Sequence, residues 1–315
     1  MNISGIHHVT AIAADPQRNV DFYAGVLGLR LVKRTVNFDD PGTYHFYFGD
    51  AVGSPGTIMT FFPWPRAVAG SSGSGMVGTT AFSIPRDSTV YWLERLSAHG
   101  FPAHLLNDWS GRAAVAVQDH DGLELLLVAE DDDDDDARAA AWGDGPVPAD
   151  HAIRSFHGVT LRVADPELTA RFLMDVFGMS EAPGEGPHLR FTAPGNSPGR
   201  VIEIEPSDEA GRGGRGTVHH VAFRARTDEE QSRWRDMLSE AGHSVTPVLD
   251  RQYFRSIYFR EPGGVLFEIA TDAPGFDHDE EAESLGTELK LPSWLEPRRT
   301  AIEEILPPIE EKSYV

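Results

Sequence analysis

The sequence predicts an α+β fold made of four modules, in each of which a strand is followed by a helix and then by further strands. Two observations carry this prediction: the chain repeats itself, and helix-capping residues stand at matching places in the repeats. The chain has 315 residues, of which 40% are hydrophobic. That length is comfortable for two halves of about 150 residues, each with its own buried core.

The clearest repeat relates two segments 150 residues apart. Residues 7–16 read His-His-Val-Thr-Ala-Ile-Ala-Ala-Asp-Pro, and residues 157–166 read His-Gly-Val-Thr-Leu-Arg-Val-Ala-Asp-Pro. Each segment predicts a strand that runs into a helix, because Asp can cap a helix and Pro suits its first turn. Both helices should end at a glycine, Gly28 or Gly178, where a left-handed residue can close a helix. The expected helices span residues 17–27 and 167–177.

A second pair of segments shares a similar order. Each begins with a strand near residue 79 or 219 and continues into a helix that contains Trp92 or Trp234. Each closes on a strand that follows a glycine turn. The four modules are therefore expected at residues 5–65, 77–130, 153–207 and 216–271.

The modules are expected to group into two halves that are joined by a linker and followed by a tail. The halves are predicted at 1–130 and 151–271, with an acidic linker at 131–150 and an acidic tail at 272–315. Like charges should extend the linker. Prolines bound a short helix that is expected at 296–306 in the tail. The tail fits a lid over a site or a structural strap equally well.

Composition excludes several classes of partner and of chemistry. The net charge of −22 disfavours binding to nucleic acid or to an anionic membrane, and it resembles the composition of proteins from salt-loving organisms. The absence of cysteine excludes thiolate chemistry and leaves histidine and carboxylates as metal ligands. No apolar run reaches 18 residues and no secretory signal is recognisable, so a cytoplasmic protein is expected.

The modular order resembles that of the vicinal oxygen chelate superfamily, which includes glyoxalases, bleomycin-resistance proteins and extradiol dioxygenases. The phrases Gly-Ile-His-His-Val-Thr at 5–10, His-His at 219–220 and Glu-Pro-Gly-Gly-Val-Leu-Phe-Glu-Ile-Ala at 261–270 are similar to those of ring-cleaving hydroquinone 1,2-dioxygenases. The resemblance implies four βαβββ modules that form two cup-shaped half-barrels. It also implies metal ligands on the first and the last strand of a module.

The repeats test which modules can supply such ligands. At the positions that the resemblance implies, modules one and four carry His8, Met59, His220 and Glu268, whereas modules two and three carry Thr79, Leu126, Gly158 and Glu203. One carboxylate is too few for a tight divalent site. We therefore expect a single metal site, at His8, His220 and Glu268, which modules one and four form by pairing. Modules two and three should form a metal-free cup.

Two histidines and one carboxylate leave open positions on an octahedral ion, as in non-haem Fe(II) oxygenases. We therefore expect Fe(II), with Mn(II) as the alternative, and a small aromatic diol and O2 as substrates. A glyoxalase would use four ligands, and the fourth would be a glutamate. In this chain Met59 is expected at that position. The alternatives left open are a catechol dioxygenase, a glyoxalase-like metalloenzyme and a non-enzymatic small-molecule-binding protein. A homo-oligomer is also left open.

The resemblance implies functional groups around the metal. His7, His219 and Tyr258 match positions that would move protons, and Thr10 and Arg251 match positions that would contact substrate. Thr10 shares the face of His8, whereas simple strand alternation points His7 and His219 away from the ligands. The aromatic residues Phe223, Phe254 and Phe267 could form ring walls, although core packing is the simpler role.

Overall fold

The computed structural model describes residues 1–109, 111–131, 142–183, 188–310, 312 and 314. Half of the predicted linker, residues 132–141, lies outside the described residues. Within the described part of the chain, no helix is long and apolar enough to cross a membrane.

The chain forms four βαβββ modules, as predicted. Module one comprises β1 (Ile6–Ala13), α1 (Pro16–Val20) continued by a π-helical turn (Asp21–Val26), β2 (Arg30–Asn37), β3 (Asp40–Gly49) and β4 (Ile58–Pro63). Module two comprises β5 (Met76–Pro85), α2 (Thr89–Ala98), β6 (Ala103–Trp109), β7 (Arg112–Gln118) and β8 (Glu124–Glu130). Module three comprises β9 (Ser155–Val163), α3 (Pro166–Asp175), β10 (Ser180–Ala182), β11 (Leu189–Thr192) and β12 (Val201–Pro206). Module four comprises β13 (Thr217–Ala225), α4 (Asp228–Glu240), β14 (Leu249–Asp250), β15 (Arg255–Arg260) and β16 (Leu266–Thr271).

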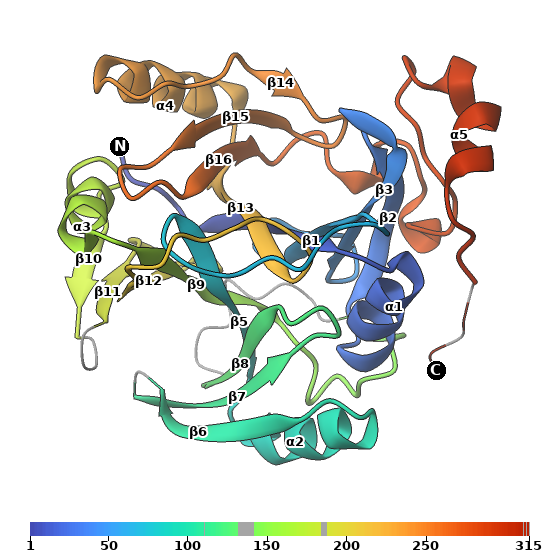
Figure 1. Ribbon diagram of the computed structural model, residues 1–315, viewed down its shortest axis with the longest axis horizontal. Helices are drawn as coiled ribbons and strands as arrows, with labels where there is room; N and C mark the ends of the chain where they lie inside the picture. The colour runs from blue at the N-terminus through green and yellow to red at the C-terminus, as the bar shows by residue number, and fades with distance from the viewer. Residues whose placement is uncertain (110, 132–141, 184–187, 311, 313, 315) are drawn as a thin grey trace.

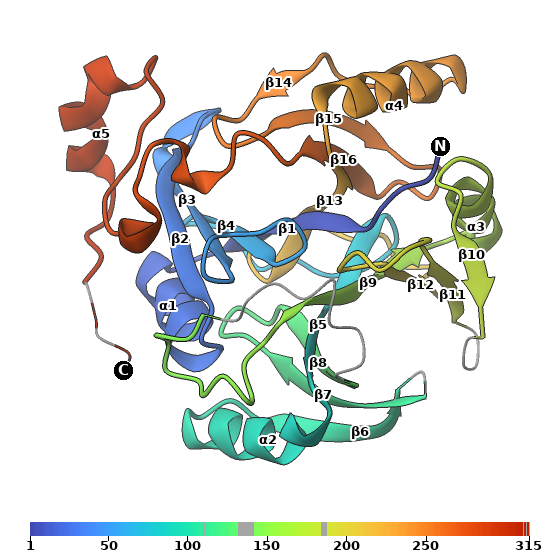
Figure 2. The same ribbon diagram turned by 180° about the vertical axis from the view of Figure 1, so that it is seen from behind.

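The modules pair in the order that the ligand comparison predicted. One eight-stranded sheet has the order β14-β15-β16-β13-β1-β4-β3-β2, so it joins modules four and one through the antiparallel pair of β1 and β13. The other has the order β10-β11-β12-β9-β5-β8-β7-β6 and joins modules three and two in the same way. Helices α4 and α2 lie at opposite ends of the molecule, outside the two sheets (Figures 1 and 2).

The predicted caps explain where the repeated helices begin and end. The side chains of Asp15 and Asp165 accept backbone hydrogen bonds at the helix starts, and Gly28 and Gly178 adopt positive φ of 72° and 67° after the helix ends. The first helix differs from the expectation in one respect, since its second half is π-helical. Trp92 and Trp234 are fully buried where α2 and α4 pack on their sheets.

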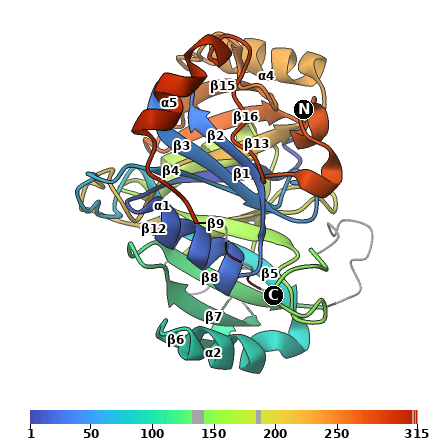
Figure 3. The same cartoon turned by 90° about the vertical axis from the view of Figure 1, so that its right-hand side faces the viewer.

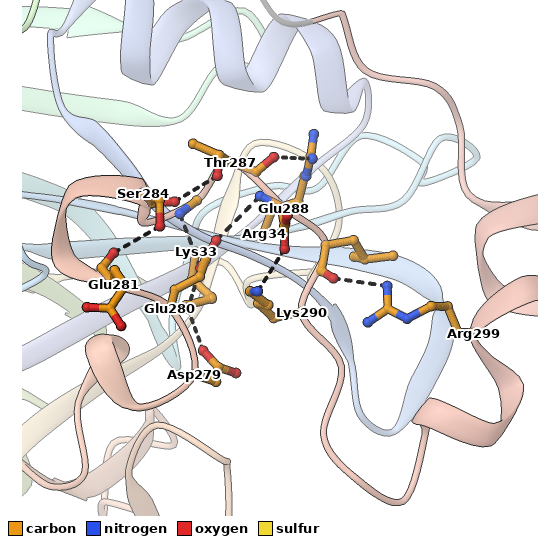
Figure 4. A network of polar contacts seen from close by, with 12 residues as sticks. Lys33, Arg34, Asp279, Glu280, Glu281, Ser284, Thr287, Glu288, Lys290 and Arg299 are labelled. Atoms are coloured by element: carbon orange, nitrogen blue, oxygen red, sulfur yellow. Dashed lines mark hydrogen bonds and ion pairs between the residues drawn. The ribbon is translucent and has the colours of Figure 1, made fainter.

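The tail lies along module one as a strap, which is one of its two expected roles (Figures 2 and 3). Its anchor is Lys33 on β2, which is fully buried and contacts Asp279 at 2.6 Å and Glu280 at 2.5 Å (Figure 4). The hydroxyl of Tyr253 donates to Asp279 at 3.1 Å. Phe276 packs against Tyr253 in the same hydrophobic cluster. The tail also contains the predicted short helix, as a 3-10 turn (Glu296–Arg298) followed by α5 (Arg299–Ile305).

Candidate metal centre

Strand register brings three potential ligands together in the first sheet. His8 on β1 and His220 on β13 come from adjacent antiparallel strands, and Glu268 lies on β16, which runs parallel to β13 on its other side. All three side chains are buried. In the described part of the chain, they are the one group of histidine and acidic residues whose ligand atoms all lie within 4.8 Å of one another.

The spacing of the three ligand atoms fits a divalent ion. His8 Nε2 lies 3.3 Å from His220 Nε2 and 3.3 Å from Glu268 Oε2, and His220 Nε2 lies 2.8 Å from that same oxygen. Metal–ligand bonds of about 2.1 Å at right angles place neighbouring ligand atoms about 3.0 Å apart. Glu268 Oε2 is buried and, within the described part of the chain, has no hydrogen-bond partner of good geometry. A buried acceptor left without a donor fits a metal ligand.

The carboxylate is held in its charged form. Glu268 accepts a hydrogen bond at Oε1 from the hydroxyl of Ser256, which leaves Oε2 directed at the histidines. Burial alone would raise the pKa of Glu268, but the imidazoles of His8 and His220 outweigh it and hold that pKa well below its usual range. An ionised oxygen is the form that binds a cation.

His7 and His219 lie beside the ligands, because each occupies a β-bulge. The register of β1 and β13 shifts between Ile6 and His8 and again between Thr10 and Ala11, which leaves one extra residue in each strand. A bulge re-aims side chains and breaks the alternation of faces. The expectation from simple alternation, that these two histidines point away from the ligands, is therefore wrong.

The two bulged histidines make hydrogen bonds to the ligands. His7 Nδ1 lies 3.0 Å from His8 Nδ1, and His219 Nδ1 lies 2.7 Å from His220 Nδ1. His7 also makes a hydrogen bond with the backbone of Thr271. If His7 donates that bond through Nε2, its Nδ1 must accept from His8, whose Nε2 then keeps a free lone pair. Burial and His8 lower the pKa of His7 well below its usual value, and desolvation and His220 lower that of His219 to about 3, so both rings stay neutral.

Arg251 and Tyr258 form a hydrogen-bonded pair at one wall of the site. Arg251 donates through Nε to the hydroxyl of Tyr258 at 3.2 Å and through Nη1 to Asp39 at 3.1 Å. The ring of Tyr258 packs on the imidazole of His220. Burial and the charge of Glu268 raise the pKa of Tyr258, although Arg251 opposes them. Because Arg251 donates to the phenol oxygen, the phenol proton stays available as a hydrogen-bond donor.

A cavity of about 250 Å³ opens beside these groups. The predicted residues His8, Thr10, His219, His220, Arg251 and Tyr258 all line it. His7 and Glu268 are buried, and neither lines the cavity. Of the three candidate wall aromatics, Phe254 lines the cavity, whereas Phe223 and Phe267 are buried in the main hydrophobic core.

One predicted equivalence is wrong. In module four, Glu268 pairs with the residue that lies two positions after the first-strand ligand. The same place in module one is taken by Thr60, which pairs with Thr10, whereas Met59 lies in the hydrophobic core. A shift of one residue moves a strand position to the opposite face. The residue in place of a fourth ligand is therefore a threonine, and module one still offers no carboxylate there.

Sequence reasoning missed several polar groups of the cavity wall. His45, Tyr47 and Asp39 all line it, and they come from β3 and from the turn that precedes it. The one available signal was that His45 and Tyr47 alternate along a strand and so share a face. That signal is weak, because nothing in the sequence states that β3 borders the strands of the metal site.

The second sheet has the same architecture without the ligands. Its central strands shift register at Gly78 and His157, the counterparts of the bulges in the first sheet. Its single matching carboxylate, Glu203, is bound by Arg190 at 2.8 Å. An arginine in this place neutralises the carboxylate, so the second cup contains a buried ion pair where the first contains the ligand cluster.

Comparison with known proteins agrees with this architecture. The model of the Glyoxalase/Bleomycin resistance protein/Dioxygenase superfamily matches residues 5–127 and 155–269. The chain is 48% identical over 308 residues to the "Putative ring-cleaving dioxygenase MhqO" of Bacillus subtilis, covering 97% of this chain and 96% of the relative. It is 30% identical to the "Chlorohydroquinone/hydroquinone 1,2-dioxygenase" of Sphingobium indicum, covering 93% of each chain.

A solved structure extends the likeness to three dimensions. The crystal structure of a protein described as a "putative dioxygenase" from Bacillus subtilis superposes with a TM-score of 0.93 at 47% identity, over 98% of each chain. The expectation of an enzyme of the ring-cleaving dioxygenase kind is thus confirmed. The chain belongs to the Glyoxalase/Bleomycin resistance protein/Dioxygenase superfamily.

Proposed function

We propose that this enzyme is an Fe(II)-dependent dioxygenase that opens the ring of 1,4-dihydroxybenzenes, with His8, His220 and Glu268 as the metal ligands. The observation that carries the proposal is a cluster of two histidines and one carboxylate that borders a polar-walled cavity of single-ring size. Such a ligand set leaves metal positions open for substrate and dioxygen. The relative that acts on hydroquinones supports the choice of substrate class.

Bound at this site, the ion would supply Lewis acidity toward a substrate hydroxyl and redox chemistry toward dioxygen. The remaining work falls to the protein. Arg251 carries a charge next to the cavity, because Tyr258 and Asp39 raise its pKa although burial lowers it. A guanidinium and a phenol donor can together hold an ionised aromatic hydroxyl. His219 lies on the cavity wall with a neutral ring, so it can donate a hydrogen bond to a bound oxygen or accept one from it there.

The cavity size supports a substrate with a single ring. A dry cavity of about 150 Å³ holds benzene, so about 250 Å³ suits a benzene ring with two hydroxyls and a small substituent. The walls formed by Phe38, Phe62, Trp64 and Phe254 fit an aromatic face.

Oxygen uptake tests the proposed function. Metal-free protein would be loaded anaerobically with Fe(II), Mn(II) or Zn(II) and then mixed with aerated hydroquinone, methylhydroquinone or catechol in an oxygen electrode. We expect the Fe(II) form to consume one O2 per hydroquinone without added reductant, because both oxygen atoms enter the ring-opened product. Uptake with catechol alone would reassign the substrate. The absence of uptake with every diol, together with turnover of a methylglyoxal–thiol adduct, would replace the proposal by an isomerase.

Replacement of Tyr258 by phenylalanine should lower the turnover rate of the Fe(II) enzyme by about 10²-fold, because it removes a positioned proton donor. The metal affinity should not change, since Tyr258 is not one of the three ligands. Steady-state oxygen uptake and metal titration would measure the two quantities separately. A variant whose KM rises while kcat is retained would assign Tyr258 to substrate binding instead.

A further inference from the structure

A row of side chains crosses the first sheet away from the metal centre. His220 on β13 pairs with Thr10 on β1. Thr60 on β4 pairs with Thr10 on one side and with Tyr47 on β3 on the other. Adjacent strands lie about 4.8 Å apart, so the row leaves His220 in steps of one strand. Tyr258 lies on the opposite side of the centre, on β15, next to Glu268.

Hydrogen bonds connect the side chains of this row through the imidazole of His45. The Tyr47 hydroxyl lies 2.9 Å from His45 Nδ1, and His45 Nε2 lies 2.8 Å from the Thr60 hydroxyl. The Thr60 hydroxyl donates to that of Thr10 at 2.9 Å. Tyr47, Thr60 and Thr10 are buried, and Tyr47, His45 and Thr10 line the cavity. We call these four residues the hydroxyl–imidazole chain.

The chain of bonds has a direction. In the described part of the protein, His45 is the hydrogen-bond partner of the Tyr47 hydroxyl, so this buried O–H must donate to Nδ1. Burial and His8 lower the pKa of His45 well below its usual value, and a neutral imidazole that accepts at one nitrogen donates at the other. His45 therefore donates to Thr60, which donates to Thr10. The proton of the Thr10 hydroxyl is left to point into the cavity.

We propose that the hydroxyl–imidazole chain binds the substrate hydroxyl that is not on the metal, and that it thereby selects 1,4-dihydroxybenzenes. This inference rests on the proposed function. The two hydroxyls of such a diol lie at opposite ends of the ring. In the sheet, β15, which carries Tyr258, and β4 and β3, which carry Thr60, His45 and Tyr47, lie on opposite sides of the three ligand strands. One wall carries Arg251 and Tyr258, and the other ends in the Thr10 donor. In a catechol the second hydroxyl lies beside the first, away from this donor.

Thr60 and His45 are positioning residues in this scheme, because they act on substrate through Thr10. Without the Thr60 donor, the Thr10 hydroxyl is free to turn away from substrate. The loss of the one neutral hydrogen bond that Thr10 then no longer makes to substrate corresponds to about tenfold weaker binding. Thr60→Val removes the donor to Thr10 with little change in size. We expect this variant to bind hydroquinone about tenfold more weakly and to bind phenol, which lacks the second hydroxyl, as the unmodified protein does.

The measurement is anaerobic calorimetry of hydroquinone and phenol with Fe(II)-loaded protein, so turnover plays no part. His45→Gln keeps one donor and one acceptor and should retain more of the preference for hydroquinone than His45→Leu. Thr80→Val is the matched control, because Thr80 is a buried threonine of the second sheet whose hydroxyl has no hydrogen-bond partner among the residues that the structure describes. The Thr80→Val control should keep the full preference for hydroquinone over phenol.

Two results would overturn the inference. One is an unchanged preference for hydroquinone over phenol in Thr60→Val. The other is an equal loss of affinity for hydroquinone and for phenol, which would indicate a structural role. The outcome is separable from that of the proposed function. If Fe(II) protein consumes oxygen with hydroquinone while the variants keep their preference, the inference alone fails. If no oxygen is consumed but Thr60→Val loses its preference, ring cleavage fails and the recognition element is supported.

Discussion

Replacement of Glu268 by glutamine should weaken metal binding by several orders of magnitude and abolish ring cleavage. Glutamine keeps the shape of the side chain, but it removes the negative charge from the buried oxygen that faces His8 and His220. Removing one partner from a buried, desolvated charge pair costs about 3–5 kcal/mol, which corresponds to a metal affinity lower by about 10²- to 10⁴-fold. Ring cleavage by the proposed mechanism should then fall to background.

The effect can be measured without any assay of activity. An ion that binds the native state at about 100 times its Kd stabilises it by about 2.7 kcal/mol. The unmodified protein should therefore unfold at a higher denaturant concentration when Fe(II) is added anaerobically, and Glu268→Gln should not. Glu203→Gln is the matched control, since Glu203 is the buried carboxylate at the equivalent place in the second sheet. If Glu268→Gln retains the metal-induced shift, the ligand assignment is wrong.

The internal repeat is the reason that so much of the first sheet could be predicted. Strands that end in Asp-Pro and helices that end in glycine set the position of His8 and His220 within their modules. Equivalent positions in the four modules indicate which pair can hold a metal, and the order of strands confirms that pairing. The prediction holds because two copies of one fold place equivalent residues on equivalent faces.

The errors arose where strand phase departs from simple alternation. His7 and His219 occupy bulges, and an inserted residue leaves no mark in the pattern of apolar residues. The strand that contains Met59 and Thr60 is apolar on both faces, so its sequence does not reveal which residue faces the metal. The contribution of His45 depends on the neighbour of β3, a contact between separate strands that local patterns do not encode.

The tail lies beyond prediction from local sequence for a related reason. Its acidic residues look like a solvated segment, yet Asp279 and Glu280 bind the buried Lys33 on β2. The partners are more than 240 residues apart in the chain, as the separations of 246 and 247 show. Only the folded sheet shows that Lys33 is buried in the middle of a strand, so that it needs these two carboxylates as counter-ions.

The substitution Lys33→Met should strongly destabilise the folded protein, although Lys33 lies outside the metal centre. It leaves the carboxylates of Asp279 and Glu280 without the cation that neutralises them. It also removes the ammonium group that lies 5.0 Å from the ring centroid of Tyr253. Breaking a buried pair in this way costs about 3–5 kcal/mol. The midpoint of urea unfolding, followed by circular dichroism on metal-free protein, measures the loss.

Lys290→Met is the matched control for this prediction. Lys290 lies in the strap itself and pairs with Glu288 at 2.8 Å (Figure 4). Unlike the partners of Lys33, this carboxylate is 73% exposed. An exposed pair contributes about 1 kcal/mol or less, so the control should unfold near the unmodified protein. The triple variant Lys33→Met, Asp279→Asn, Glu280→Gln should recover part of the lost stability, because no buried charge is then left unpaired. If Lys33→Met is no less stable than Lys290→Met, the strap is held by the packing of Phe276 and its neighbours, and the buried ions contribute little.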